Sequence, residues 1–201
     1  MSRMVLLLAC LPAFCTAQRF TLGPIEFEAD ADGIIVQYHG HEWKPDLSKL
    51  TVRVADCRPV AWDEFNEILY FTAQTVVLGY DLRSEQVKRI VDNYEHPYDG
   101  PGAVSPLGRH VVLISHDTCG GCCASSYLVI VDTQARKQTS YHLPAGNIAS
   151  NIASNEAARI TSVRWTGQSV LEYSAEVRTK LDCGASRKMT GRFTLVQNSD
   201  N

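Results

Sequence analysis

The sequence lacks the features that would assign a reaction or a membrane span. Its 201 residues contain no catalytic signature, no convincing amphipathic helix and, after the first residues, no long hydrophobic run. There is no Asn-x-Ser/Thr acceptor site, which is compatible with a bacterial periplasm. The 19 basic and 22 acidic residues form no basic stripe, and this balance argues against a nucleic-acid or anionic-membrane partner. These absences favour a protein that is not an enzyme.

The first residues predict export. Arg3 provides a positive charge, residues 4–14 an apolar core, and Cys15-Thr16-Ala17 a small-residue cleavage site. We therefore expect residues 1–17 to be a signal peptide and the protein to be periplasmic. A lipid anchor on Cys10 is the second interpretation, ranked lower because it leaves an apolar core shorter than the usual minimum of about 7 residues.

Residues 18–201 are long enough for a single domain with its own core. Apolar residues alternate or run continuously in short segments separated by turn residues, which is typical of β-strands. Leu50–Ala55, for example, alternates cleanly and predicts a strand. Three similar strand-turn-strand units follow one another, and their paired strands begin near Ile68, Val111 and Val170.

This repetition predicts an all-β fold, an antiparallel meander of blade-like units similar to a β-propeller. A β-sandwich built from the same hairpins is the alternative, because sequence does not show whether sheets close into a ring.

One hairpin has an unusual tip. The apolar runs Arg109–Ser115 and Tyr127–Asp132 flank eleven small, polar and cysteine residues, 116–126. Hairpin loops usually need about 2–5 residues, and longer ones are often functional or held by a disulfide. The equivalent tip of the preceding unit, 72–75, has four residues. Equivalent hairpins of neighbouring blades point the same way, so we expect these tips, and that near Cys183, to share one edge.

The exported part of the chain has an odd number of cysteines, so at most two internal disulfides form. The disulfide candidates are Cys57, Cys119, Cys122, Cys123 and Cys183. The leading interpretation joins Cys183 to one of the three cysteines of the tip. The alternatives are a Cys119/Cys122 redox pair, a metal held by His116 and the cysteines, and a cysteine nucleophile with His116 as base.

Two weaker metal patterns are better explained by turns. Asp30-Ala31-Asp32-Gly33 resembles part of a calcium loop but lacks the remaining acidic ligands. His39 and His41 would lie on one strand face without a third ligand nearby. We therefore expect no cofactor and no resident metal.

The segment His116-Asp117-Thr118 to Ala124-Ser125-Ser126-Tyr127, within residues 104–143, resembles the central hairpin of a family. This family comprises the periplasmic immunity proteins that neutralise peptidoglycan amidase toxins delivered by type VI secretion. The resemblance implies a propeller-like β protein that inserts a serine-bearing loop into the cysteine–histidine active site of the toxin. It implies that the partner-binding residues are His116, Asp117, Thr118, Gly120, Gly121, Ala124, Ser125 and Ser126.

The sequence thus predicts an exported protein that blocks a cell-wall hydrolase by occlusion, without chemistry of its own. One alternative is an exported metal- or ligand-binding domain of the same fold. Another is a thiol-redox protein that uses Cys119, Cys122 and Cys123. The oligomeric state is not predicted.

Overall fold

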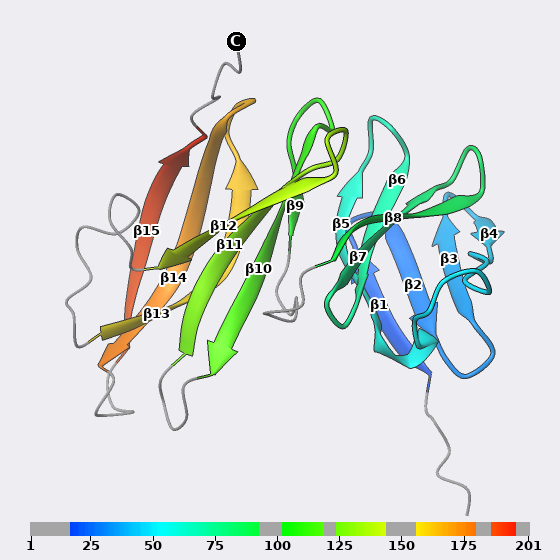
Figure 1. Ribbon diagram of the computed structural model, residues 1–201, viewed down its shortest axis with the longest axis horizontal. Coiled ribbons are helices and arrows are strands. Elements are labelled where there is room, and N and C mark those ends of the chain that lie inside the picture. Colours follow the sequence, from blue (N-terminus) through cyan, green and yellow to red (C-terminus); the bar gives the residue numbers. More distant parts are fainter. Residues whose placement is uncertain (1–16, 93–101, 119–123, 144–155, 180–185, 196–201) are drawn as a thin grey trace, which may run out of the picture.

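The computed structural model (Figure 1) describes residues 17–92, 102–118, 124–143, 156–179 and 186–195. Fifteen strands in these residues form four antiparallel sheets. The 3-10 helix η1, Val54–Asp56, is the only helix among the described residues. Within this part of the chain, no helix has the length and hydropathy needed to cross a membrane.

Each sheet is formed by consecutive strands. The first consists of β1 (Gln18–Leu22), β2 (Ile25–Ala29), β3 (Ile34–Tyr38) and β4 (His41–Trp43). The second consists of β5 (Cys57–Asp63), β6 (Ile68–Ala73), β7 (Val76–Asp81) and β8 (Gln86–Asp92). The third consists of β9 (Ala103–Val104), β10 (His110–Thr118), β11 (Ala124–Asp132) and β12 (Lys137–Leu143), and the fourth of β13 (Glu156–Trp165), β14 (Val170–Thr179) and β15 (Arg187–Thr194).

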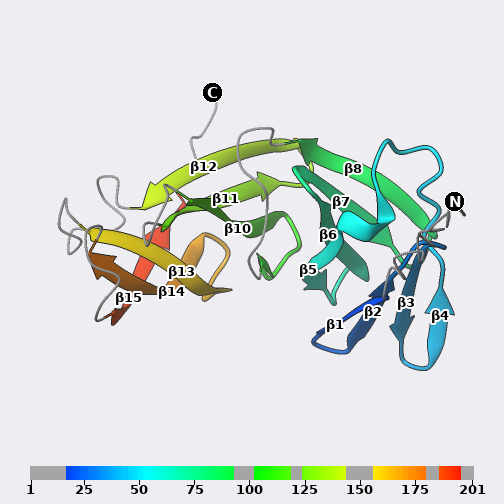
Figure 2. The same ribbon diagram turned by 90° about the horizontal axis from the view of Figure 1, so that it is seen from below.

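The four sheets follow one another in an arc, and the first and fourth sheets lie at its two ends (Figure 2). Strand β5 packs against β1 and β2 of the first sheet and against β9 of the third. Strand β13 packs against β9, β10 and β11. Each inner sheet therefore packs on two neighbours, which is the arrangement of propeller blades and not of a two-layer sandwich.

An apolar core fills each junction between neighbouring sheets. Phe27, Phe71 and Leu78 belong to the core that joins the first two sheets. Val77 and Val129 belong to the core between the second and third sheets. The core between the third and fourth sheets contains residues such as Leu128, Ile160 and Tyr173. Burial of these side chains is the main stabilising contribution to the arc.

The two sheets at the ends of the arc are apolar on one face only. In β14, Leu171, Tyr173, Ala175 and Val177 are buried against the third sheet, and the residues between them are partly exposed. In β2, Ile25, Phe27 and Ala29 are buried in the same alternating manner. Polar outer faces let the arc end at these sheets without exposing an apolar surface to water.

The predicted all-β antiparallel meander of blade-like units is confirmed. The strand predicted over Leu50–Ala55 is wrong, because its second half forms η1 and the segment pairs with no sheet. Leu50, Val52 and Val54 alternate because they pack against the first core from a loop. An alternating pattern indicates that one face of an extended segment is buried, and here that segment is a loop that pairs with no strand.

Candidate functional site

The hairpin β10–β11 is longer than its sequence pattern predicts. Its strands have nine residues each and remain paired through His116–Ser126, Asp117–Ser125 and Thr118–Ala124. The expected eleven-residue tip is therefore wrong, since only residues 119–123 lie beyond the paired strands. Small polar residues satisfy the backbone ladder as well as apolar ones do, so the change in composition at His116 does not end the strand.

Among the described residues, the end of the hairpin has no flanking strand in its own sheet, although β13 of the fourth sheet packs alongside β11. Strand β12 pairs with β11 only as far as Ser126, opposite Leu143. Strand β9 pairs with β10 only at Val111 and Val112. The last two residue pairs of the hairpin thus project past the strands that flank it. The backbones of Asp117, Thr118, Ala124 and Ser125 lie in this projecting part, and Gly120 and Gly121 lie outside the described residues.

Ser126 fastens the base of this projection to the neighbouring sheet. Its side chain is fully buried, and its Oγ accepts a hydrogen bond from the backbone N–H of Ile160 at 3.0 Å. The same oxygen lies 2.7 Å from Nδ1 of the half-buried His116. An N–H at the edge of β13 would otherwise be buried without an acceptor. The expectation that Ser126 is presented to a partner is therefore wrong, and Ser126 is an anchor.

The described strand ends that lead into the tips of the third and fourth sheets lie at one edge, and the tips themselves, with Cys183, lie outside the described residues. Ser126 of β11 bonds Ile160, and further along Trp165 Nε1 donates to Ala103 O at 3.1 Å. Ala103 pairs with Val112, which pairs with Ile130, so the two contacts place β13 alongside β11 in the same direction. The start of β11 and the end of β14, which pairs with the start of β13, therefore lie at the same edge of the two sheets. Figure 1 shows the arrowheads of β10 and β14 at this edge.

Among the described cysteines, Cys57 is free and buried in the first core. Its Sγ lies 3.7 Å from Arg53 O. Burial, followed by the negative charge of Asp56, raises the pKa of the thiol to about 12. The inclusion of Cys57 among the disulfide candidates is wrong, because a thiol in this environment is neutral and inaccessible to oxidants. Cys119, Cys122, Cys123 and Cys183 lie outside the described residues, so their pairing stays a prediction.

With Cys57 set apart, four cysteines remain in the part of the chain that we expect to be exported, Cys119, Cys122, Cys123 and Cys183, and they form an even set. We expect two disulfides among them in protein isolated from an oxidising compartment. Thiol titration should then find no reactive thiol in the native protein and one per chain in denaturant. Cys57→Ser should remove that single thiol. Two or more thiols per chain in denaturant would contradict the prediction.

The weaker metal patterns behave as turns. Asp30 Oδ1 accepts hydrogen bonds from the N–H groups of Asp32 and Gly33, so this carboxylate closes its own turn. His39 lies in the β3–β4 turn with a positive φ of 49°, and its ring packs on that of Tyr38. In the described residues, no group of three His, Cys, Asp or Glu side chains is placed to hold a metal ion.

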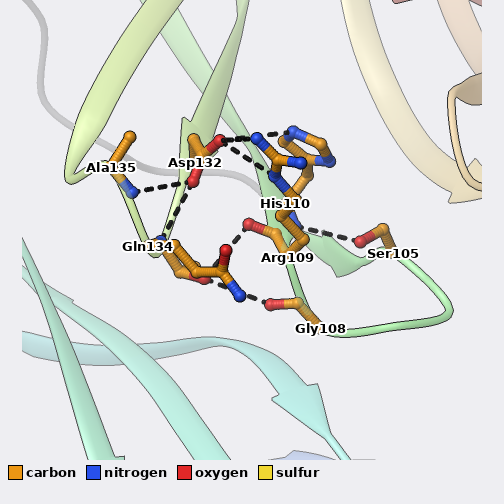
Figure 3. A network of polar contacts seen from close by, with 8 residues as sticks. Ser105, Gly108, Arg109, His110, Asp132, Gln134 and Ala135 are labelled. Carbon is orange, nitrogen blue, oxygen red and sulfur yellow. Dashed lines mark hydrogen bonds and ion pairs between the residues drawn. The ribbon is translucent and has the colours of Figure 1, made fainter.

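A polar network at the opposite end of the hairpin joins two turns (Figure 3). Asp132 Oδ1 accepts from the N–H groups of Gln134 and Ala135, and Oδ2 accepts from Arg109 Nε at 3.1 Å. His110 Nε2 lies 3.8 Å from Asp132 Oδ2. The backbone N–H of His110 donates to Ser105 Oγ at 3.0 Å. The sequence gives no local signal for this network, because Arg109 at the start of β10 and Asp132 at the end of β11 are 23 residues apart in the chain.

Ser105, His110 and Asp132 are the residue types of a hydrolase triad, but their geometry is not that of one. The buried hydroxyl of Ser105 accepts a bond from the backbone of His110 and not from its ring. The ring of His110 stacks on Trp165 at 6.1 Å, and burial lowers its pKa. The network therefore fixes the two turns and holds no nucleophile ready for reaction.

No family model matches the chain, and no curated protein sequence matches it. A tricorn protease structure is similar, with a TM-score of 0.54 and 10% identity over 89% of this chain and 17% of that chain. The Pyrococcus horikoshii acylaminoacyl peptidase gives 0.50 and 10% over 88% and 32%. A chain of a nidogen/laminin complex gives 0.47 and 8% over 87% and 61%. This chain spans less than two thirds of each of them, and the likeness bears on the fold alone.

Proposed function

We propose that this protein is an exported, non-enzymatic inhibitor that blocks a peptidoglycan-degrading cysteine amidase with its β10–β11 hairpin. The observation that supports this proposal best is that the hairpin extends beyond β9 and β12 and is anchored at its base by the buried Ser126. A segment that enters a catalytic cleft must extend past its own sheet and must be held in position at its base. The hairpin has both properties.

The anchor matters for affinity. The hydrogen bond between Ser126 and Ile160 joins the third and fourth sheets, so the base of the hairpin is fixed relative to the fourth sheet. Fixing a loop before it binds reduces the conformational entropy that is lost on binding. The small residues Gly120, Gly121, Ala124 and Ser125 suit a narrow cleft, because they add little volume to the inserted segment. Occlusion of this kind needs no catalytic group in the inhibitor.

The alternatives are a metal- or ligand-binding domain and a thiol-redox protein. Both depend on cysteines outside the described residues, and no contact among the described residues favours either.

The test uses a cysteine peptidoglycan amidase encoded beside the gene of this protein. We expect the wild-type protein to inhibit hydrolysis of peptidoglycan by this enzyme. Gly121→Arg places a long charged side chain on the tip, and should weaken inhibition about 100-fold, as loss of a central interface contact does.

Gly167→Arg is the matched control. Gly167 lies in the β13–β14 turn, at the other edge of the sheets from the hairpin tip, and the nearest atom to a Cβ placed on it is Val170 Cβ at 4.0 Å. This variant should inhibit like wild type. If the amidase is not inhibited by the wild-type protein, or if Gly121→Arg inhibits as well as Gly167→Arg, the proposed mode of action is wrong.

A further inference from the structure

The outward face of the fourth sheet is basic, although the whole chain carries a net charge of −3. Five basic and two acidic side chains from the three strands point away from the third sheet: Arg159, Arg164, Arg178, Lys188 and Arg192 with Glu172 and Glu176. The basic residues are dispersed in the sequence, so the sequence shows no basic stripe. The register of the three strands gathers them on one face. This sheet lies at one end of the arc (Figure 2).

The central row of this face is an Arg–Glu–Arg arrangement across three strands. Glu172 Oε2 accepts from Arg164 Nη2 at 2.6 Å, and Glu172 Oε1 accepts from Arg192 Nη2 at 2.8 Å. Hydrogen bonds from Arg192 and then Arg164 lower the pKa of Glu172, which keeps the carboxylate charged. The side chains of Arg164 and Arg192 are 77% and 66% exposed. Glu172 thus holds two guanidinium groups in place while most of their donors face solvent.

A row of hydroxyl groups lies beside the arginines. Ser162 pairs with Ser174, and Ser174 pairs with Thr190, so the three hydroxyls follow one line across the sheet. They line a surface hollow of about 570 Å³ together with Arg164, Glu172 and Arg192. The hollow therefore combines fixed cationic donors with neutral groups that both donate and accept hydrogen bonds.

We propose that this hollow binds a polysaccharide that carries oxyanions, either carboxylates or phosphates. A guanidinium group donates two parallel N–H bonds to two oxygens of a carboxylate or of a phosphate. The hydroxyl row offers partners to the hydroxyl groups of sugars, which an anion alone would not use. The ligand lies across the strands, along the Ser162 and Arg164 rows.

The composition of the face distinguishes this ligand from other polyanions. The outward positions of β13, β14 and β15 carry no aromatic side chain, and Val170 is their one large apolar residue. Tyr173 also borders the hollow, but its side chain is buried in the core on the other face of the sheet. Single-stranded nucleic acids are bound by stacking of bases on aromatic rings. Protein partners are anchored by buried aromatic and apolar side chains. A polar, hydroxylated ligand needs neither.

The experiment measures binding of the full protein to immobilised polymers: alginate for carboxylates, teichoic acid for phosphates, dextran as a neutral glycan, poly-glutamate as an acidic peptide, and oligothymidylate. We expect binding to alginate, teichoic acid or both, and the stronger of the two identifies the anion. Arg164→Gln with Arg192→Gln should weaken this binding about tenfold or more, the loss expected for charge-assisted hydrogen bonds.

Arg83→Gln with Arg89→Gln is the control, because it removes the same charge from exposed arginines of the second sheet. It should bind like wild type, and melting temperatures should confirm that both double variants fold. Equal losses in the two variants, binding of dextran, or binding of poly-glutamate or oligothymidylate as tight as that of the polysaccharides would overturn the proposal. Gly121→Arg should leave polysaccharide binding unchanged. The proposed polysaccharide site and the proposed inhibition of the amidase are therefore tested independently of each other.

Discussion

Replacement of Gly102 by alanine is expected to lower the free energy of unfolding by about 3 kcal/mol, the upper part of the range for overpacked sites. A Cβ atom on Gly102 would lie 2.6 Å from Val112 O and 2.9 Å from Val60 O. Both are backbone atoms of paired strands, in β10 and β5. They cannot move aside without disturbing the ladders of two sheets at once, so the strain falls on the junction between them.

Gly102 also bonds across this junction, since its N–H donates to Val60 O at 2.8 Å. Urea unfolding followed by circular dichroism measures the loss. Gly167→Ala is the control, because the nearest atom to its Cβ, in Val170, is 4.0 Å away. This control should stay within about 0.5 kcal/mol of wild type, as surface substitutions do. A similarly small change for Gly102→Ala would mean that the second and third sheets separate at little cost.

The repeated units could be predicted because their strands are apolar and end at turn residues. The runs near Ile68, Val111 and Val170 became the second strands of three successive sheets. The first sheet was harder to delimit. Apolar and polar residues alternate on both sides of Gly23 and predict one strand over residues 19–28, yet a turn at Gly23 divides them into β1 and β2. The positive φ of 59° at Gly23 permits this turn, and the apolar positions change phase there, from Phe20 and Leu22 to Ile25 and Phe27.

The candidate site could be located from the sequence but not delimited. Unusual residues between two apolar runs identified the hairpin, and the hairpin does project from its sheet. The role of Ser126 depends on Ile160, which lies 34 residues further along the chain. A hydrogen bond between sheets has no local signal, so a serine at a strand end was indistinguishable from a serine in a loop.

The basic face illustrates the same limit for charge. Arg164, Glu172 and Arg192 form one row because the register of three strands aligns them. The net charge of the chain cannot detect a row of charges that runs perpendicular to the strands, and neither can a search for consecutive basic residues. Cross-strand pairing is set by turn lengths and bulges, such as the shift between Ile160 and Ser162. Once the register is known, the face follows directly from the alternation of side chains.

Substitution of Ser126 by valine is expected to have an effect as large as that of Gly102→Ala. Valine has no hydroxyl, so the N–H of Ile160 loses its acceptor in a fully buried environment. A buried donor left without a partner costs about 1–3 kcal/mol, and the added methyl group in a packed junction brings the expected loss to about 3 kcal/mol. His116 loses its hydroxyl partner in the same variant.

Three measurements separate the lost bond from a general loss of packing. Ser126→Thr keeps the hydroxyl and should therefore be more stable than Ser126→Val, although less stable than wild type. Thr139→Val, on the exposed side of β12, removes a hydroxyl where water replaces it and should change the free energy of unfolding by less than about 0.5 kcal/mol. Hydrogen exchange at the amide of Ile160 should accelerate in Ser126→Val beyond the change in global stability, because local opening at this edge no longer breaks a bond. Unchanged protection of that amide would mean that Ser126 does not hold the hairpin to the fourth sheet.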